Sequence, residues 1–234
     1  HTDSTYSDRA AFGSTLVNRP LDQLFVLNAM AGLSDDPLAG QIDTDATAII
    51  GYSMGGYGAV IAAGGGVTQS SVDLSWGAPH GLLGRHLAGS DSHNALPDAR
   101  VKTIVAFGPW GRARDFWSTE GLSGIKVPVL YIAGSEDGVS GYEDGIRRMW
   151  EETASVDRAL LTYVNAGHNA GAPMPAPAEG RAVDPDLGFA PFEHYADPVW
   201  DSVRMNNIAQ HFVTAWLDFQ VKGDASRAPY LDLV

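Results

Sequence analysis

Short apolar segments separated by polar, glycine-rich stretches recur along the chain. Four of them favour β-branched residues and stop at a glycine or a polar turn, which predicts strands over residues 47–50, 101–107, 127–133 and 160–164. Segments with helical character lie between them. Because apolar runs that alternate with helices are typical of parallel strands covered on both faces, we expect an α/β fold with a mainly parallel sheet.

Helix signals accompany these strands. Residues 20–32 begin with a proline and end with a glycine, the usual punctuation of a helix, whereas residues 1–19 are polar and turn-rich. Further helices are predicted over residues 54–63, 142–153 and 200–221, the last with Ile208, Phe212, Ala215, Trp216 and Phe219 on one face.

Two long segments have poor periodicity and are predicted as loops, at residues 64–99 and at the proline-rich stretch 169–199. The first holds His80, His86 and His93. Their spacings of six and seven residues put no two on one face of a helix or strand, and no acidic pattern accompanies them. We therefore expect solvated loop histidines rather than a metal site.

Composition narrows the class of protein. The chain has 234 residues, of which 44% are hydrophobic, and no composition break, which predicts one domain over residues 1–234. A net charge of −13 argues against nucleic acid or an anionic membrane as the main partner. No apolar run approaches the roughly 20 residues that span a bilayer. Without cysteine there is no disulfide, thiolate metal site or cysteine nucleophile.

The clearest chemical motif is Gly51-Tyr52-Ser53-Met54-Gly55, between a predicted strand and a predicted helix. Such a turn holds the serine in a strained conformation with its hydroxyl exposed, and we expect both glycines to prevent a clash between strand and helix. Ser53 is the candidate nucleophile. The free amide of Met54, at the start of the helix, is the candidate donor to an oxyanion.

Two further chemical groups follow the ends of later strands. Asp137 comes after the strand that ends near residue 133, and His168 lies in a glycine-flanked turn after the strand that ends near residue 164. Functional groups of a parallel sheet gather at the carboxyl ends of its strands. The chain order Ser53, Asp137, His168 therefore predicts a catalytic triad, with Glu136 as a competitor for the acidic position.

The chemistry explains these residue types. A serine hydroxyl is a poor nucleophile unless a base removes its proton, and His168 can do so near neutral pH and then protonate the leaving group. Asp137 would orient the imidazole and stabilise its charged form. This mechanism implies no metal and no organic cofactor. An apolar substrate pocket could be lined by Met54, Trp76, Trp110 and Trp117, of which Trp110 is the best candidate because it follows a strand end.

These motifs resemble those of the serine α/β-hydrolases, particularly the dienelactone-hydrolase-like group that includes the platelet-activating-factor-acetylhydrolase-like esterases. The resemblance covers most of the chain and is carried by residues 51–56, 134–137 and 167–168, with weaker support from 19–27 and 120–130. It implies an α/β-hydrolase fold. Dienelactone hydrolases use a cysteine nucleophile, so Ser53 points instead to a carboxylic-ester hydrolase.

The amino end departs from this family. Members have several strands before the nucleophile, and a loop among them donates the second oxyanion amide, usually from a His-Gly segment; nothing similar precedes Ser53. Residues 47–50 would then expose an apolar sheet edge. One hypothesis is that an amino-terminal fragment of the same precursor remains associated and completes both the sheet and the oxyanion hole. The alternative is a truncated sequence.

The sequence thus predicts a small-molecule carboxylic-ester hydrolase that acts through an acyl-enzyme on Ser53. A serine peptidase or amidase on the same triad is the nearest alternative, and matched ester and amide substrates would separate the two. A non-catalytic binding protein of the same fold is the alternative from another class, since half of the oxyanion apparatus is absent. It predicts that Ser53→Ala changes nothing measurable.

Overall fold

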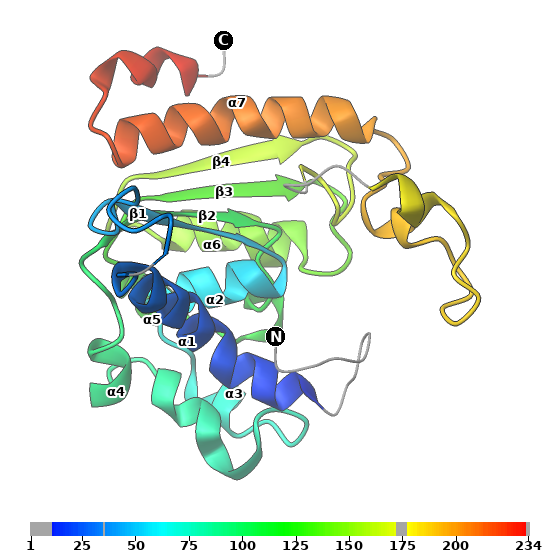
Figure 1. Cartoon of the computed structure of the whole chain (residues 1–234). Helices are drawn as coiled ribbons and strands as arrows, with labels where there is room; N and C mark the ends of the chain where they lie inside the picture. The colour runs from blue at the N-terminus through cyan, green and yellow to red at the C-terminus, as the bar shows by residue number, and fades with distance from the viewer. Residues whose placement is uncertain (1–10, 35, 172–176, 233–234) are drawn as a thin grey trace.

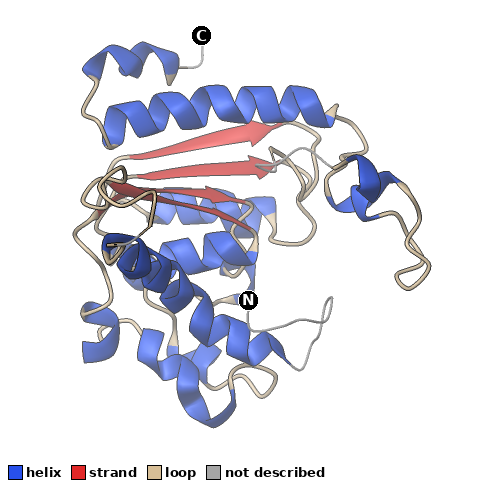
Figure 2. Ribbon diagram, in the orientation of Figure 1, coloured by secondary structure: helices blue, strands red, loops and turns tan. Residues whose placement is uncertain are grey.

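Four parallel strands form the centre of the molecule in the order β1-β2-β3-β4 (Figures 1 and 2). The computed structural model describes residues 11–34, 36–171 and 177–232. All four strands lie where the apolar pattern predicts them: β1 is Thr47–Tyr52, β2 Val101–Phe107, β3 Val129–Gly134 and β4 Arg158–Tyr163. The chain is therefore a mixed α/β protein with a parallel sheet, as expected.

Helices cover both faces of this sheet (Figure 1). On one face lies the long α7, Ser202–Gln220; on the other lie α1, Phe12–Ala31, α2, Met54–Ala62, and α6, Arg148–Glu152. Successive side chains of a strand point to opposite faces, so Val105 packs towards α7 while Ile104 packs towards α2. Each face thereby has its own apolar core.

Helix α1 differs from its prediction. It begins at Phe12 rather than near Pro20, so the expectation that residues 11–19 form turns is wrong, while residues 1–10 lie outside the described part. Leu16 and Val17 are buried against the α2 side of the sheet, and this burial extends the helix. Pro20 lies inside the helix, where it cannot donate to the carbonyl of Leu16. The hydroxyl of Tyr57 donates to that carbonyl instead, at 3.0 Å.

The segment 64–99 is an excursion built of short helical turns: α3, Gln69–Val72, a kinked 3₁₀ segment, Pro79–His86, and α4, Asp91–Asn94. His86 and His93 are buried, so the expectation of solvated histidines is wrong for both, although His80 is exposed. Each buried ring donates from Nε2 to a distant main-chain carbonyl, His86 to Val17 at 2.8 Å and His93 to Gly64 at 3.0 Å.

The remaining helices are short. Thr119–Ser123 forms α5, and the predicted helix at residues 142–153 consists of a π-helical part, Tyr142–Arg147, followed by α6. The proline-rich stretch contains single 3₁₀ turns at Ala178–Arg181 and Pro191–His194, and another, Ala225–Tyr230, follows α7. None of the helices described here combines the length and the apolar character needed to cross a bilayer.

Candidate active site

Ser53 lies at the sharp turn between β1 and α2. Its backbone has φ 53° and ψ −114°, a strained conformation for a residue with a side chain. The Ser53 amide donates to the carbonyl of Phe107 on β2 at 2.8 Å, which fixes the turn against the neighbouring strand. A Cβ atom on Gly51 would lie 2.2 Å from the carbonyl of Gly55, whereas one on Gly55 would meet nothing within 4 Å. The prediction that glycine prevents a clash between strand and helix is therefore confirmed for Gly51 and wrong for Gly55.

The structure brings Ser53, His168 and Asp137 together in one chain of hydrogen bonds. The Nε2 atom of His168 lies 3.0 Å from the hydroxyl oxygen of Ser53. Its Nδ1 atom lies 2.9 Å from Oδ2 of Asp137. Ser53 and His168 are 115 positions apart in sequence, and Asp137 and His168 are 31 apart. Each of the three follows the end of a different strand. With Nδ1 donating to the carboxylate, Nε2 is left to accept the serine proton.

Asp137 rather than Glu136 contacts His168. Asp137 is only 4% exposed, while Glu136 points to solvent. Burial by itself raises the pKa of Asp137, but the hydrogen bond and charge of His168 and the amides of Ser140 and Val139 outweigh it and lower this pKa below its ordinary value. Those two amides donate to Oδ1 at 2.8 and 2.9 Å. The carboxylate therefore stays ionised and has an oxygen available for His168.

Gly108, directly after β2, is a site residue that sequence reasoning missed. Its φ of +49° favours glycine, and a Cβ atom there would lie 3.2 Å from Cε1 of His168 and 3.4 Å from Oδ2 of Asp137. Its carbonyl accepts from the hydroxyl of Ser140 at 2.8 Å. The only signal in the sequence was a glycine at a strand end, which by itself does not predict a contact with the triad.

The turn that carries His168 is held from both sides. Tyr52, next to the nucleophile, donates its hydroxyl to Oδ1 of Asn169 at 2.7 Å. Burial, with a smaller effect from the nearby Asp137, raises the pKa of Tyr52, so its hydroxyl remains a donor. On the other side the amide of Gly167 donates to Oδ2 of Asp197 at 2.7 Å. These contacts connect the imidazole to β1 and to the proline-rich loop.

The remaining predicted site residues are placed as follows. Met54 is the first residue of α2, so its amide has no acceptor within that helix, as expected for an oxyanion donor. Trp110 lies beside the nucleophile, its amide 3.4 Å from the carbonyl of Ser53, and its ring packs edge-on against Phe12 and Phe116. Half of the surface of Trp76 is exposed, at 50%.

Trp117 cannot line a substrate pocket, which corrects the prediction for this residue. It is 1% exposed and donates its indole N–H to the carbonyl of Gly65 at 3.2 Å. Its ring packs against Tyr57 within the core on the α2 side of the sheet. Aromatic residues near a strand end look alike in sequence, and only the contacts separate a core residue from a surface one.

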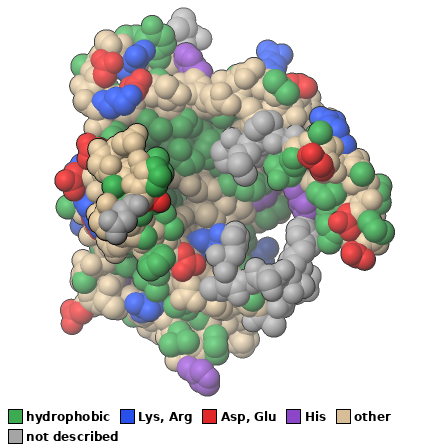
Figure 3. Space-filling view, in the orientation of Figure 1, with side chains coloured by type: hydrophobic (Ala, Val, Ile, Leu, Met, Phe, Trp, Pro, Cys, Tyr) green, Lys and Arg blue, Asp and Glu red, His purple; other side chains and the backbone are tan. Residues whose placement is uncertain are grey.

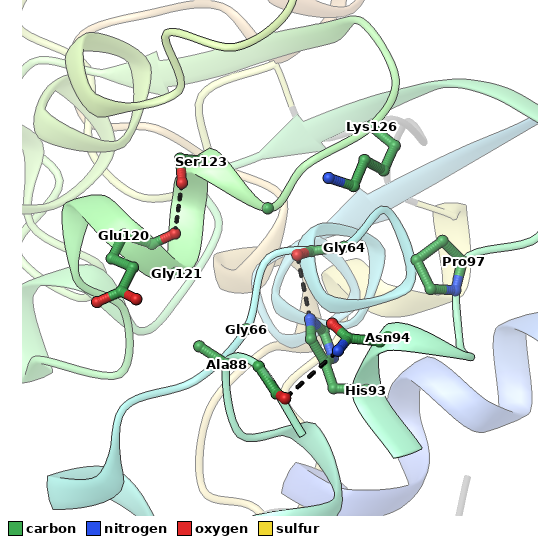
Figure 4. A pocket seen from close by; sticks show the side chains of 12 residues that line it. Gly64, Gly66, Ala88, His93, Asn94, Pro97, Glu120, Gly121, Ser123 and Lys126 are labelled. Atoms are coloured by element: carbon green, nitrogen blue, oxygen red, sulfur yellow. Dashed lines mark hydrogen bonds between the residues drawn. The ribbon is translucent and has the colours of Figure 1, made fainter. Parts of the chain in front are cut away.

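A separate cavity of about 250 Å³ lies at the carboxyl-terminal end of α2, the opposite end from Ser53 (Figure 4). His93, Asn94 and Lys126 line it together with several glycines. Nε2 of His93 donates to the carbonyl of Gly64, its Nδ1 has no partner among the described residues, and the amide of Asn94 donates to the carbonyl of Gly89. Because it lies at the far end of α2 from Ser53, the cavity is distinct from the candidate active site.

In the described part of the chain, no three histidine, aspartate or glutamate side chains are grouped to hold a metal ion. The site instead consists of the Ser53 hydroxyl, the His168 imidazole and the ionised Asp137 carboxylate, joined in line by hydrogen bonds.

Models of known protein families give no match to this chain, and curated proteins give none either.

Proposed function

We propose that this protein is a carboxylic-ester hydrolase with an α/β-hydrolase fold that acts through an acyl-enzyme on Ser53. One observation carries the proposal: the hydrogen-bonded line from Ser53 through His168 to Asp137, at the carboxyl ends of β1, β3 and β4. A hydroxyl, an imidazole and a carboxylate in this order are the groups that acyl transfer requires. The parallel sheet with helices on both faces supports the proposed fold.

In the first half of the proposed reaction, the Ser53 oxygen attacks the ester carbonyl while Nε2 of His168 takes the hydroxyl proton. The carbonyl electron pair moves to oxygen, and the amide of Met54 donates a hydrogen bond to that oxyanion. When the tetrahedral intermediate collapses, the bond to the alcohol breaks and His168 returns the proton to the departing oxygen. Asp137 stabilises the imidazolium during both steps without taking its proton.

In the second half, water replaces the alcohol and His168 acts as its base. Attack on the acyl carbon breaks the bond to the Ser53 oxygen, which regains its proton, and the carboxylic acid leaves. Trp110, whose main-chain amide lies 3.4 Å from the carbonyl of Ser53, is the proposed apolar contact for substrate. Esters are preferred over amides in this proposal because the motifs resemble those of ester hydrolases. Matched p-nitrophenyl ester and p-nitroanilide substrates test that preference.

The decisive experiment is intact-mass analysis after treatment with a fluorophosphonate, which reacts with activated serines. The wild-type protein should gain one adduct and hydrolyse p-nitrophenyl butyrate. Ser53→Ala should lose both the adduct and the hydrolysis, while the exposed, distant Ser123→Ala should keep both. An unlabelled wild-type chain without hydrolysis, or a Ser53→Ala variant that keeps its activity, would refute the proposal.

A further inference from the structure

A second hydrogen bond runs beside the one between Ser53 and His168. Tyr52 directly precedes the nucleophile, and Asn169 directly follows the imidazole. The hydroxyl of Tyr52 donates to Oδ1 of Asn169 at 2.7 Å, while Nε2 of His168 lies 3.0 Å from the Ser53 oxygen. The two turns are thus joined at two adjacent pairs of residues, and only one of these bonds takes part in the proposed chemistry.

The amide group of Asn169 joins the same side chain to a third segment. Its two N–H groups donate to the carbonyls of Glu193 at 3.1 Å and Ala196 at 2.8 Å. An asparagine side chain offers two donors and one acceptor oxygen, so each polar atom of this one has a partner. The side chain is therefore fixed in orientation, and it connects the turn that carries His168 to two other parts of the chain at once.

The proline-rich loop depends on contacts at its base, because it projects from the body of the molecule (Figures 1 and 3). Its second attachment lies on the other side of the imidazole, where the amide of Gly167 donates to Oδ2 of Asp197 at 2.7 Å. The Oδ1 atom of Asp197 accepts from two amides of its own segment, which hold the carboxylate in place. Both neighbours of His168 in sequence are therefore bonded to the segment 193–197.

This support matters because the bond between Ser53 and His168 is weak by itself. A hydrogen bond between neutral groups contributes little net stability, whereas catalytic groups must be held to within about 0.5 Å of the productive geometry. The ring of Tyr52 also packs against the imidazole, with ring centres 5.2 Å apart and planes tilted by 36°. Without its hydroxyl, that ring would still pack there but would no longer be bonded to the turn that carries His168.

We propose that Asn169 is a positioning residue that, together with the hydroxyl of Tyr52, sets the distance from Nε2 of His168 to the Ser53 oxygen. In this role Asn169 acts through the neighbouring imidazole rather than on the substrate. The proposal rests on the hydrolytic function proposed above, since it concerns the proton transfer that this function requires. It adds a condition that the triad alone does not contain: the proline-rich loop must be docked for the base to be in place.

Steady-state kinetics with p-nitrophenyl butyrate test the proposal on Tyr52→Phe, Asn169→Ala and the double variant. Each single substitution should lower kcat by about 10- to 100-fold and leave KM within about twofold, because the base is displaced while the substrate contacts remain. The double variant should be no slower than Asn169→Ala, since the two substitutions remove the same bond. Circular dichroism confirms that each variant is folded at the assay temperature.

Tyr131→Phe is the matched control. It also removes a tyrosine hydroxyl from a hydrogen bond with a side chain, that of Thr153 at 2.8 Å, but this bond lies in the core on the α2 side of the sheet. It should keep the kcat of the wild type to within about twofold, even though it loses stability.

An NMR signal that does not depend on turnover separates positioning from stability. In mildly alkaline solution, the ¹⁵N chemical shift of Nε2 of His168 reports whether the Ser53 hydroxyl donates to it, and Ser53→Ala gives the value without this bond. Tyr52→Phe and Asn169→Ala should move the shift towards the Ser53→Ala value. Tyr131→Phe should keep the wild-type value.

An unchanged Nε2 shift in Tyr52→Phe and Asn169→Ala would overturn the proposal, whatever happens to kcat. Strictly multiplicative losses of kcat in the double variant would also overturn it, because the two residues would then act separately. If Asn169→Ala does not fold, Tyr52→Phe decides alone, since it lacks only one hydroxyl. Failure of the proposed function looks different: the wild type itself would hydrolyse no ester, while the Nε2 shift would still report the position of the ring.

Discussion

Ser53 occupies a backbone conformation that costs about 1–3 kcal/mol for a residue with a side chain. Main-chain hydrogen bonds hold it there: its amide donates to Phe107, and its carbonyl accepts from Tyr57 and Trp110. This network directs the hydroxyl towards His168 without the aid of a side-chain cap. The strain is thus confined to the residue whose position matters most for the proposed chemistry.

Asp137→Asn should lower kcat for p-nitrophenyl butyrate by about 10³- to 10⁴-fold, because an amide cannot hold the correct His168 tautomer or stabilise the imidazolium. The neighbouring Glu136→Gln is the matched control and should stay within about twofold of wild type, since Glu136 is exposed and lies outside the hydrogen-bonded line. Equal effects in the two variants would remove Asp137 from its proposed role.

Gly108→Ala should damage activity more than stability. The added methyl group would press on the His168 ring. It should reduce kcat by about tenfold or more, because small displacements of reacting groups slow the reaction strongly. Gly89→Ala is the control, since Gly89 also has a positive φ, +80°, but has open space around its Cβ position. Both should lose about 1–2 kcal/mol of stability from backbone strain. Only Gly108→Ala should lose activity; an active Gly108→Ala enzyme would contradict this assignment.

Helix α1 shows how one element depends on another that lies far from it in sequence. Pro20 interrupts the helical hydrogen bonding, and the buried carbonyl of Leu16 is satisfied by the hydroxyl of Tyr57 on α2. Because both groups are out of water, loss of either would leave a buried polar atom unpaired. The contact also fixes α1 against α2, the helix that directly follows Ser53.

A double-mutant cycle tests this contact. Tyr57→Phe should lower the free energy of unfolding by about 1–3 kcal/mol, because the Leu16 carbonyl loses its donor. Adding Pro20→Ala should restore about 1 kcal/mol of that loss, since the new amide can bond to the same carbonyl. Urea denaturation of the four proteins measures the coupling. Strictly additive effects would show that the two residues do not share the carbonyl.

Across the whole molecule, the candidate site lies at the carboxyl ends of the strands, while the segment 64–99 packs beneath α1 and α2 (Figure 1). The buried His86 connects this segment to α1 through the carbonyl of Val17. Burial lowers the pKa of His86 to about 4 from 6.5, because its surroundings disfavour the charged ring. The attachment of this segment therefore depends on a neutral histidine.

Because the pKa of His86 is lowered in the folded protein, we expect the free energy of unfolding to fall in acid. The unfolded chain binds a proton near pH 6.5 and the folded one only near pH 4, so the stability due to His86 is present above pH 6.5 and is lost as the pH falls towards 4. Between pH 7.5 and 5 the loss should be about 2 kcal/mol. His86→Gln, which keeps a donor but does not titrate, should lose about 2 kcal/mol less over that range in urea denaturation. Parallel losses in both proteins would exclude His86 as the cause.

Local signals in the sequence were enough for the order of the elements and for the residues at the strand ends. The strands are recognisable from their own apolar, β-branched residues. Ser53, Asp137 and His168 each lie in a turn that the adjacent residues predict. The start of α1 was missed because the usual punctuation favoured Pro20, whereas burial of Leu16 and a hydroxyl from Tyr57 stabilise the earlier turns.

By itself, then, the sequence determined the α/β class, the four strands and the polar residues at the strand ends on which the proposed chemistry rests, because these depend on neighbours along the chain. The tertiary structure alone decided which strands pair, that Asp137 rather than Glu136 meets the imidazole, that Gly108 lies against it, and that Trp117 is buried. Each of these depends on contacts between segments far apart in sequence, and such contacts leave no local periodicity to read.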